Sequence, residues 1–140
     1  MTTNSTPLLL ITADPSHPLA HLALRYAKAV LEHAEISTDT AQNNPALKVF
    51  FYADAAHTAN RLRWQSADQA NLTQEWQTLA ERYQLPLAIC VSTALSRGVS
   101  DEDNSTRHQL QGDNIAQGFH LVGLSELAMM MQSNCRLISF

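Results

Sequence analysis

The chain has 140 residues and a mass of 15.5 kDa, which suits a single compact domain. Hydrophobic residues make up 45% of it and charged residues 16%, a composition that excludes a disordered or fibrous protein. With 9 Lys and Arg against 13 Asp and Glu, the net charge is −4, so the chain lacks the positive surface of a protein that binds nucleic acid on its own.

Five apolar runs predict strands, and helical segments lie between them. A polar segment, residues 1–7, is expected to form a flexible tail before a domain over residues 8–140. The predicted strands are residues 8–12, 47–53, 85–91, 119–122 and 136–140. Strands that alternate with helices predict a single layered α/β/α domain with a mostly parallel five-stranded sheet, in which right-handed crossovers place helices on both faces.

The first helices are predicted from the spacing of apolar residues and from capping residues. After Pro18, apolar residues recur at helical spacing and mark one face; they are Leu19, Leu22, Ala23, Tyr26, Ala27 and Val30. Asn71, with Gln74 three residues on, predicts the start of a second helix. Ser92 is expected to cap a short helix that ends at Gly98.

Polar segments predict the connections. Residues 35–46 are predicted to be a surface connection, residues 55–69 an irregular or short-helical segment, and residues 100–112 an exposed, mobile loop. The last helix is predicted to have Ser125 as its cap. Its apolar face comprises Leu124, Leu127, Ala128 and Met131. Three consecutive methionines, residues 129–131, cannot all face one core, so they either fill the core or form a subunit contact.

Cys90 is the main candidate for chemistry. It follows the apolar run 87–89 near the carboxyl end of the strand predicted at 85–91, and reactive groups of an open parallel sheet gather outside the carboxyl ends of the strands. A helix that starts there would direct free N–H groups and a partial positive charge toward the sulfur, which lowers the pKa of a thiol and favours the nucleophilic thiolate. Arg97 would add positive charge if the following loop folds back. The alternative is a cysteine that only packs in the core.

The other candidate groups are weaker. No stretch reaches the roughly 18 apolar residues of a membrane span, and the N-terminus lacks a signal-peptide pattern, so we expect a cytoplasmic protein. Cys90 and Cys135 are therefore expected to stay reduced. Cys135 follows the end of a helix, where the dipole disfavours a thiolate. His17 and His21 are four residues apart but lack a third ligand, so no metal site is predicted.

Residues 85–99, which contain Cys90, and the following Asp101 and Glu102 resemble the active-cysteine segment of the DsrE family. The resemblance covers most of the chain from Leu8 onward. It includes the second strand at 49–52, the helix at 71–80 with Trp76, and the C-terminal segments 114–124 and 135–140. The proline-containing loop at 13–18 and the long connection at 35–46 depart from the family pattern.

The resemblance implies a sulfurtransferase subunit of a sulfur relay. It implies that Cys90 accepts sulfane sulfur as a persulfide and passes it on for 2-thiolation of the tRNA wobble uridine, without metal or organic cofactor. The implied partners are TusB-like and TusC-like subunits in a heterohexamer, a TusA-like sulfur donor and a TusE-like acceptor, with neither stable binding to nucleic acid nor a membrane. Two alternatives stay open, namely a DsrE-type subunit of dissimilatory sulfur oxidation and a non-catalytic assembly subunit of the same fold.

Overall fold

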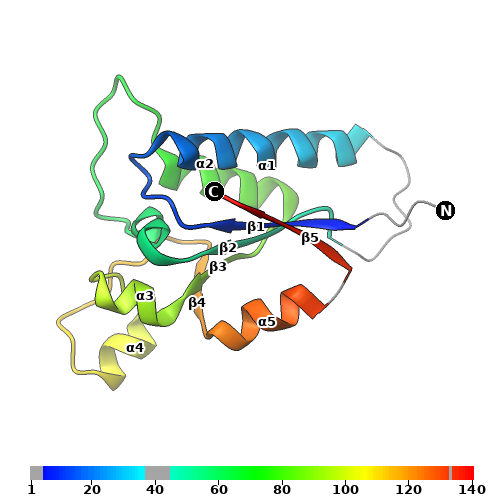
Figure 1. The fold of residues 1–140 in the computed structure, drawn as a ribbon. Helices are drawn as coiled ribbons and strands as arrows, with labels where there is room; N and C mark the ends of the chain where they lie inside the picture. Colours follow the sequence, from blue (N-terminus) through cyan, green and yellow to red (C-terminus); the bar gives the residue numbers. More distant parts are fainter. Residues whose placement is uncertain (1–4, 37–44, 133) are drawn as a thin grey trace.

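Strands and helices alternate along the whole chain (Figure 1). The computed structural model describes residues 5–36, 45–132 and 134–140. In chain order the elements are β1 (Thr6–Ile11), α1 (Pro18–Ile36), β2 (Lys48–Phe51), the 3-10 helix η1 (Ala53–Ala59), α2 (Leu72–Tyr83), β3 (Leu87–Cys90), α3 (Val91–Ser96), α4 (Glu102–Arg107), β4 (Phe119–Val122), α5 (Leu124–Gln132) and β5 (Cys135–Ser139). Within the described residues, no helix combines the length and the apolar character that a membrane crossing requires.

The strands form one five-stranded sheet in the order β4-β3-β2-β1-β5, and every neighbouring pair is parallel. Helices α1 and α2 lie on one face and α5 lies on the other (Figure 1). The predicted class, an α/β/α domain with a parallel sheet, is confirmed. Parallel strands need long crossover connections, and helices between strands provide them.

The two faces of the sheet are packed to different degrees. On the α1 and α2 face, Phe51 meets the edge of Trp76 with ring centroids 5.3 Å apart, and both side chains are fully buried. The α5 face holds a much smaller buried cluster of Phe50, Ala88 and Cys90. Neighbouring residues of a strand point to opposite faces, which is why Phe50 and Phe51 belong to different clusters.

Helix α1 starts at Pro18 as predicted, but it turns a different face toward the sheet. Its buried side chains are Ala20, Ala23, Leu24, Ala27 and Leu31. Leu19 and Leu22, which the spacing placed on the inner face, are exposed. The helix is apolar around much of its circumference, so spacing alone leaves its rotation open; the small alanines allow the closest contact with the sheet.

The strand boundaries differ from the predicted ones for local reasons. β1 begins at Thr6, ahead of the predicted start, while β3 begins at Leu87, after a proline that cannot donate to a ladder. β2 ends at Phe51, and Ala53 soon after it has a left-handed φ of 54°. Residues 1–4 of the predicted tail, and most of the predicted 35–46 connection, lie outside the described residues.

The prediction of an exposed, mobile loop over residues 100–112 is wrong in part, because most of the segment is exposed but it contains a helix. The segment contains α4, whose N-cap Asp101 accepts a hydrogen bond from the Asn104 backbone N–H at 2.8 Å. Ser100 and Ser105 are buried, with their hydroxyl oxygens 2.7 Å apart. Short polar residues satisfy backbone groups at helix ends, so a polar composition does not by itself indicate mobility.

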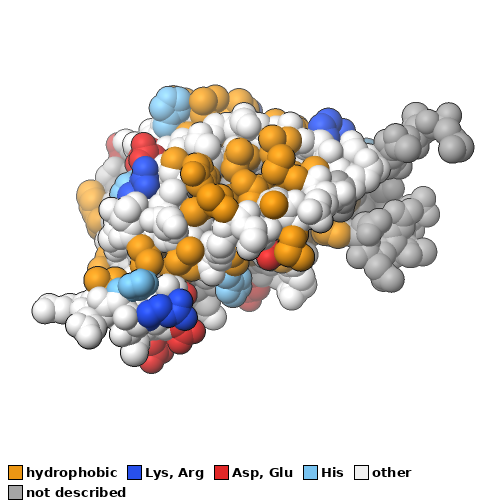
Figure 2. All heavy atoms as spheres, turned by 60° about the horizontal axis from the view of Figure 1, so that its bottom comes forward, with side chains coloured by type: hydrophobic (Ala, Val, Ile, Leu, Met, Phe, Trp, Pro, Cys, Tyr) orange, Lys and Arg blue, Asp and Glu red, His pale blue; other side chains and the backbone are white. Residues whose placement is uncertain are grey.

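Helix α5 buries fewer side chains than any other α-helix in the described part of the chain. None of its described side chains is buried. Leu127 and Met130 are half-buried against the sheet, whereas Leu124, Ala128 and Met131 of the predicted inner face are exposed. Ser125 lies inside the helix instead of capping it. Hydrophobic side chains are spread over this side of the molecule (Figure 2).

Candidate functional site

Cys90 is the last residue of β3 and the N-cap of α3. It pairs in register with Val122 of β4, at the carboxyl edge of the sheet. The prediction that Ser92 caps this helix is wrong, because the helix already begins at Val91. Strand and helix follow each other without a linker, so Cys90 lies at the junction itself.

Cys90 is only 1% exposed. It belongs to the apolar cluster with Phe50 and Ala88 on the α5 face. Five half-buried side chains pack against this cluster, namely Leu10, Tyr52, Val122, Leu127 and Met130. The cluster around Cys90 thus combines apolar side chains from β1, β2, β3 and β4, from Tyr52 just after β2, and from α5.

Arg97 is paired with groups of η1 and of its own helix. Its Nε donates to Oδ1 of Asp54 at 3.0 Å, and its Nη1 donates to the Thr93 carbonyl at 3.2 Å. Asp54 directly follows Ala53, whose left-handed backbone begins η1 after the end of β2. The ion pair thus ties α3 to η1, and it sets the negative charge of Asp54 against the positive charge of Arg97.

The second cysteine is not brought near the first. Cys135 is the first residue of β5, and β1 and β2 separate β5 from β3 in the sheet. Both thiols are free. Cys135 is half-buried, and its Sγ lies 3.8 Å from the Met131 carbonyl oxygen at the end of α5.

The predicted histidine pair does not converge on a metal-like site. His17 is exposed, and its Nδ1 accepts a hydrogen bond from the Leu19 backbone N–H at 3.1 Å. Among the described residues, no group of three or more His, Cys, Asp or Glu side chains is placed to hold a metal ion.

The loop after β1 carries one polar arrangement that the sequence did not indicate. Asp14 Oδ1 accepts hydrogen bonds from the Ser16 backbone N–H at 2.9 Å and from the Ser16 hydroxyl at 2.6 Å. Burial raises the pKa of Asp14, but the bonds from Ser16, with the nearby charges of His57 and Arg63, outweigh burial and lower it. These contacts shape the start of α1; they involve no residue of the Cys90 cluster.

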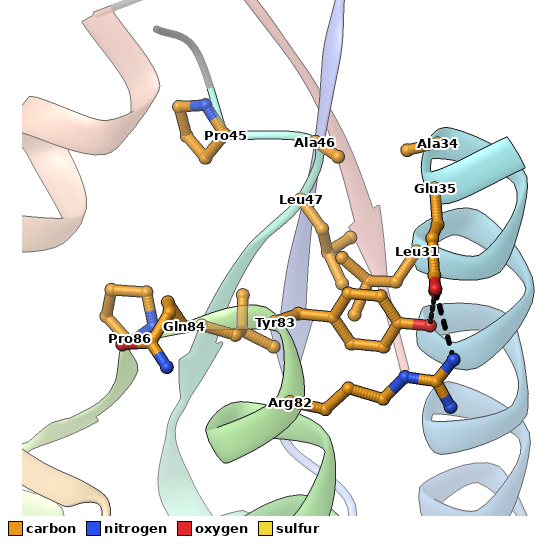
Figure 3. Close-up of a pocket in the computed structure, with 11 residues that line it drawn as sticks. Leu31, Ala34, Glu35, Pro45, Ala46, Leu47, Arg82, Tyr83, Gln84 and Pro86 are labelled. Atoms are coloured by element: carbon orange, nitrogen blue, oxygen red, sulfur yellow. Dashed lines mark hydrogen bonds and ion pairs between the residues drawn. The ribbon is translucent and has the colours of Figure 1, made fainter. Parts of the chain in front are cut away.

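A cavity of 670 Å³ lies at the opposite edge of the sheet, between the carboxyl ends of α1 and α2 (Figure 3). Its polar groups bind one another. Glu35 accepts a hydrogen bond from the Tyr83 hydroxyl at 2.6 Å, and it forms an ion pair with Arg82 at 3.1 Å. The hydrogen bond from Tyr83, followed by that from Arg82, lowers the pKa of Glu35. Leu47 and Leu85, which precede β2 and β3, line it, so it is remote from Cys90 along the strands.

Comparisons with known proteins place the chain in a family. The model of the DsrE/DsrF-like family matches residues 8–140. The chain belongs to this family. The "Sulfurtransferase TusD homolog" of Vibrio parahaemolyticus is 36% identical over 121 residues, which are 86% of this chain and 86% of the relative. The "Sulfurtransferase TusD" of Proteus mirabilis is 36% identical over 138 residues, which are 98% of this chain and 99% of the relative.

Solved structures show the same fold. The crystal structure of the ychN protein from E. coli superimposes with a TM-score of 0.67 at 17% identity, covering 96% of this chain and 99% of that chain. A protein of unknown function from Methanobacterium thermoautotrophicum superimposes with a TM-score of 0.51 at 10% identity, covering 98% and 100% of the two chains. The resemblance to the DsrE family noted in the sequence is confirmed.

Sequence reasoning placed Cys90 correctly at the end of a strand, but it missed the residues around the thiol. Tyr52, Leu127 and Met130 lie far from Cys90 in the sequence and reach its cluster only through the sheet order and the packing of α5. The Asp54 partner of Arg97 had one signal in the sequence, since it directly follows an apolar run at a carboxyl edge.

Proposed function

We propose that this chain is a sulfurtransferase subunit of a sulfur relay and that Cys90 carries the transferred sulfur as a persulfide. The observation that carries the proposal is the position of Cys90 at the carboxyl end of β3, in a chain whose relatives of nearly equal length are named sulfurtransferases. The carboxyl edge is where open parallel sheets place reactive groups.

The proposed chemistry is thiol exchange between sulfur atoms. The Cys90 thiolate attacks the terminal sulfur of a donor persulfide, a new S–S bond forms on Cys90, and the donor leaves as a thiolate. An acceptor thiolate then attacks the outer sulfur and releases the Cys90 thiolate. Each step breaks one S–S bond and forms another, so the exchange is balanced without an outside oxidant or reductant.

The proposed partners follow from the family resemblance and from the exposed side of α5. Met129 is 64% exposed and Leu124 50% exposed, on the side of the molecule rich in hydrophobic side chains (Figure 2). Exposed apolar surface of this kind is typical of subunit contacts.

We propose TusB-like and TusC-like subunits in a heterohexamer, a TusA-like donor and a TusE-like acceptor. Light scattering of the chain with and without the two subunits tests the assembly, and an unchanged monomer would contradict it.

The decisive experiment measures sulfur on the protein by intact mass after incubation with a persulfurated donor carrier. Wild-type chain and the Cys135→Ser variant are expected to gain one sulfur atom, and Cys90→Ser is expected to gain none. Sulfur on Cys135, or uptake that persists without Cys90, would show that the site assignment is wrong. Loss of uptake in all three would favour a non-catalytic assembly subunit.

The destination of the sulfur is a separate part of the proposal, namely 2-thiolation of the tRNA wobble uridine. In cells that carry Cys90→Ser, thiolated wobble uridine is expected to disappear, while Cys135→Ser leaves it near the wild-type amount. Normal tRNA thiolation together with lost sulfur uptake in vitro would point to sulfur oxidation, which uses the same exchange chemistry.

A further inference from the structure

The proposed transfer requires the Cys90 sulfur to touch the sulfur of another protein, yet Cys90 is 1% exposed. Bond formation between two sulfur atoms cannot proceed through a layer of packed side chains. Part of the cover over Cys90 therefore has to move before exchange. This inference rests on the proposed function, and it concerns which part moves.

The half-buried cover around the Cys90 cluster has two origins. Leu10 and Val122 belong to β1 and β4, which are held by ladder hydrogen bonds, and Tyr52 follows β2 with its backbone N–H donating to the Ile11 carbonyl at 2.8 Å. The backbones of these residues are fixed in the sheet, so that only rotation of their side chains could uncover the thiol. Leu127 and Met130 instead come from α5, which packs on the sheet from outside.

Helix α5 is held to the sheet by little buried surface. Helix α1 buries five side chains and α2 buries four, whereas none of the described side chains of α5 is buried. A groove of 470 Å³ lies beside α5 and is lined by Lys48, Ala88 and Met130 among others, but not by Cys90. One polar contact crosses from the sheet to the helix here, because Lys48 Nζ donates to the Met130 carbonyl at 3.4 Å. Elements that bury little apolar surface open locally at lower free-energy cost than the rest of a domain.

We propose that α5 is the cover of the sulfur site and that the contacts of Leu127 and Met130 with the Cys90 cluster hold this cover closed. Displacement of α5 exposes the thiol, while the sheet and α3 stay in place. The outer side of the same helix carries the exposed Leu124 and Met129, so a protein that docks there acts directly on the element that closes the site.

The test measures how fast Cys90 reacts with iodoacetamide in the native full-length chain, in a Cys135→Ser background so that one thiol is followed by intact mass. The reagent forms an S–C bond with the thiolate and releases iodide. Leu127→Ala and Met130→Ala, two independent variants, are each expected to react about tenfold faster, because truncation removes contacts that exist only in the closed state. Circular dichroism verifies that each variant is folded.

Two matched controls separate local opening from general destabilisation. Met129→Ala truncates an exposed neighbour on the same helix and is expected to change the rate by less than about twofold. Leu79→Ala weakens the core under α2, on the opposite face, and is expected to leave the rate near that of the parent. Equal acceleration by Leu79→Ala would show that Cys90 reacts through global unfolding, and no acceleration by either α5 variant would also overturn the proposal.

The outcome is distinguishable from a failure of the proposed function, because alkylation needs no sulfur donor. If the alkylation rates follow the expected order and Cys90 takes no sulfur from any donor, the cover is established and the relay function is wrong. If Cys90 takes sulfur but the α5 variants react like Met129→Ala, the relay function stands and the cover is wrong.

Discussion

Substitutions at Cys90 test the local structure on which the proposed site depends. Cys90 is the N-cap of α3, with extended backbone angles of −60° and 120° and no hydrogen bond from its own side chain to the helix. A serine at an N-cap accepts a hydrogen bond from a backbone N–H of the first turn. We therefore expect Cys90→Ser to be more stable than Cys90→Ala, although the side chain lies in an apolar cluster.

The magnitude follows from two opposing effects. Both variants lose the contacts of a buried sulfur, at a cost of about 1 kcal/mol for a group of this size. In Cys90→Ser, a capping hydrogen bond returns about 1 kcal/mol after rotation of the side chain about χ1. The expected free energy of unfolding of Cys90→Ser is thus close to that of the wild type, and that of Cys90→Ala is about 1 kcal/mol lower.

Urea unfolding followed by the fluorescence of the buried Trp76 measures both variants, with equal m-values as the condition for comparison. Cys135→Ser, at a half-buried position that begins a strand, is the matched control and is expected to change stability little. If the hydroxyl finds no partner, its burial costs about 1–3 kcal/mol and the order reverses. A Cys90→Ala variant that is the more stable of the two would therefore refute the capping geometry at this junction.

Three further predictions concern the rest of the fold. Trp76→Ala is expected to lower the free energy of unfolding by about 3–5 kcal/mol because the ring is fully buried, whereas Trp64→Ala, which removes an 82% exposed ring, should stay within about 0.5 kcal/mol, both measured by urea unfolding followed by circular dichroism. Asp101→Ala should cost about 1 kcal/mol in that assay through loss of the α4 cap, and no measurable loss would contradict the assignment of that cap. The lowered pKa of Glu35 stabilises the fold at pH values above the ordinary pKa of the carboxyl group, and this stabilisation is lost as the pH falls through the lower folded-state value. The midpoint of thermal unfolding of Glu35→Gln should consequently depend less on pH in the acid range than that of the wild type. An unchanged pH profile would refute the role of the Tyr83 bond.

The sequence by itself determined the five strands, most of the helices and the fold class. Apolar runs and helical spacing depend on residues that are neighbours along the chain, so the parallel α/β/α architecture could be predicted, as could the first residue of α1 and the Asn71 cap, whose side chain accepts from the Gln74 backbone N–H at 3.2 Å. The same local pattern placed Cys90 at the end of a strand, because an apolar run stops there.

Only the tertiary structure decided what surrounds Cys90. The rotation of α1, the pairing of Asp54 with Arg97 and the placement of Leu127 and Met130 on the Cys90 cluster depend on strand order and on helix packing. These contacts join residues that are far apart in the chain, and their energy depends on distance and shape in three dimensions, to which a repeating pattern along the sequence is not sensitive. For that reason the sequence indicates a thiol at a carboxyl edge, whereas its burial beneath α5 follows from the fold.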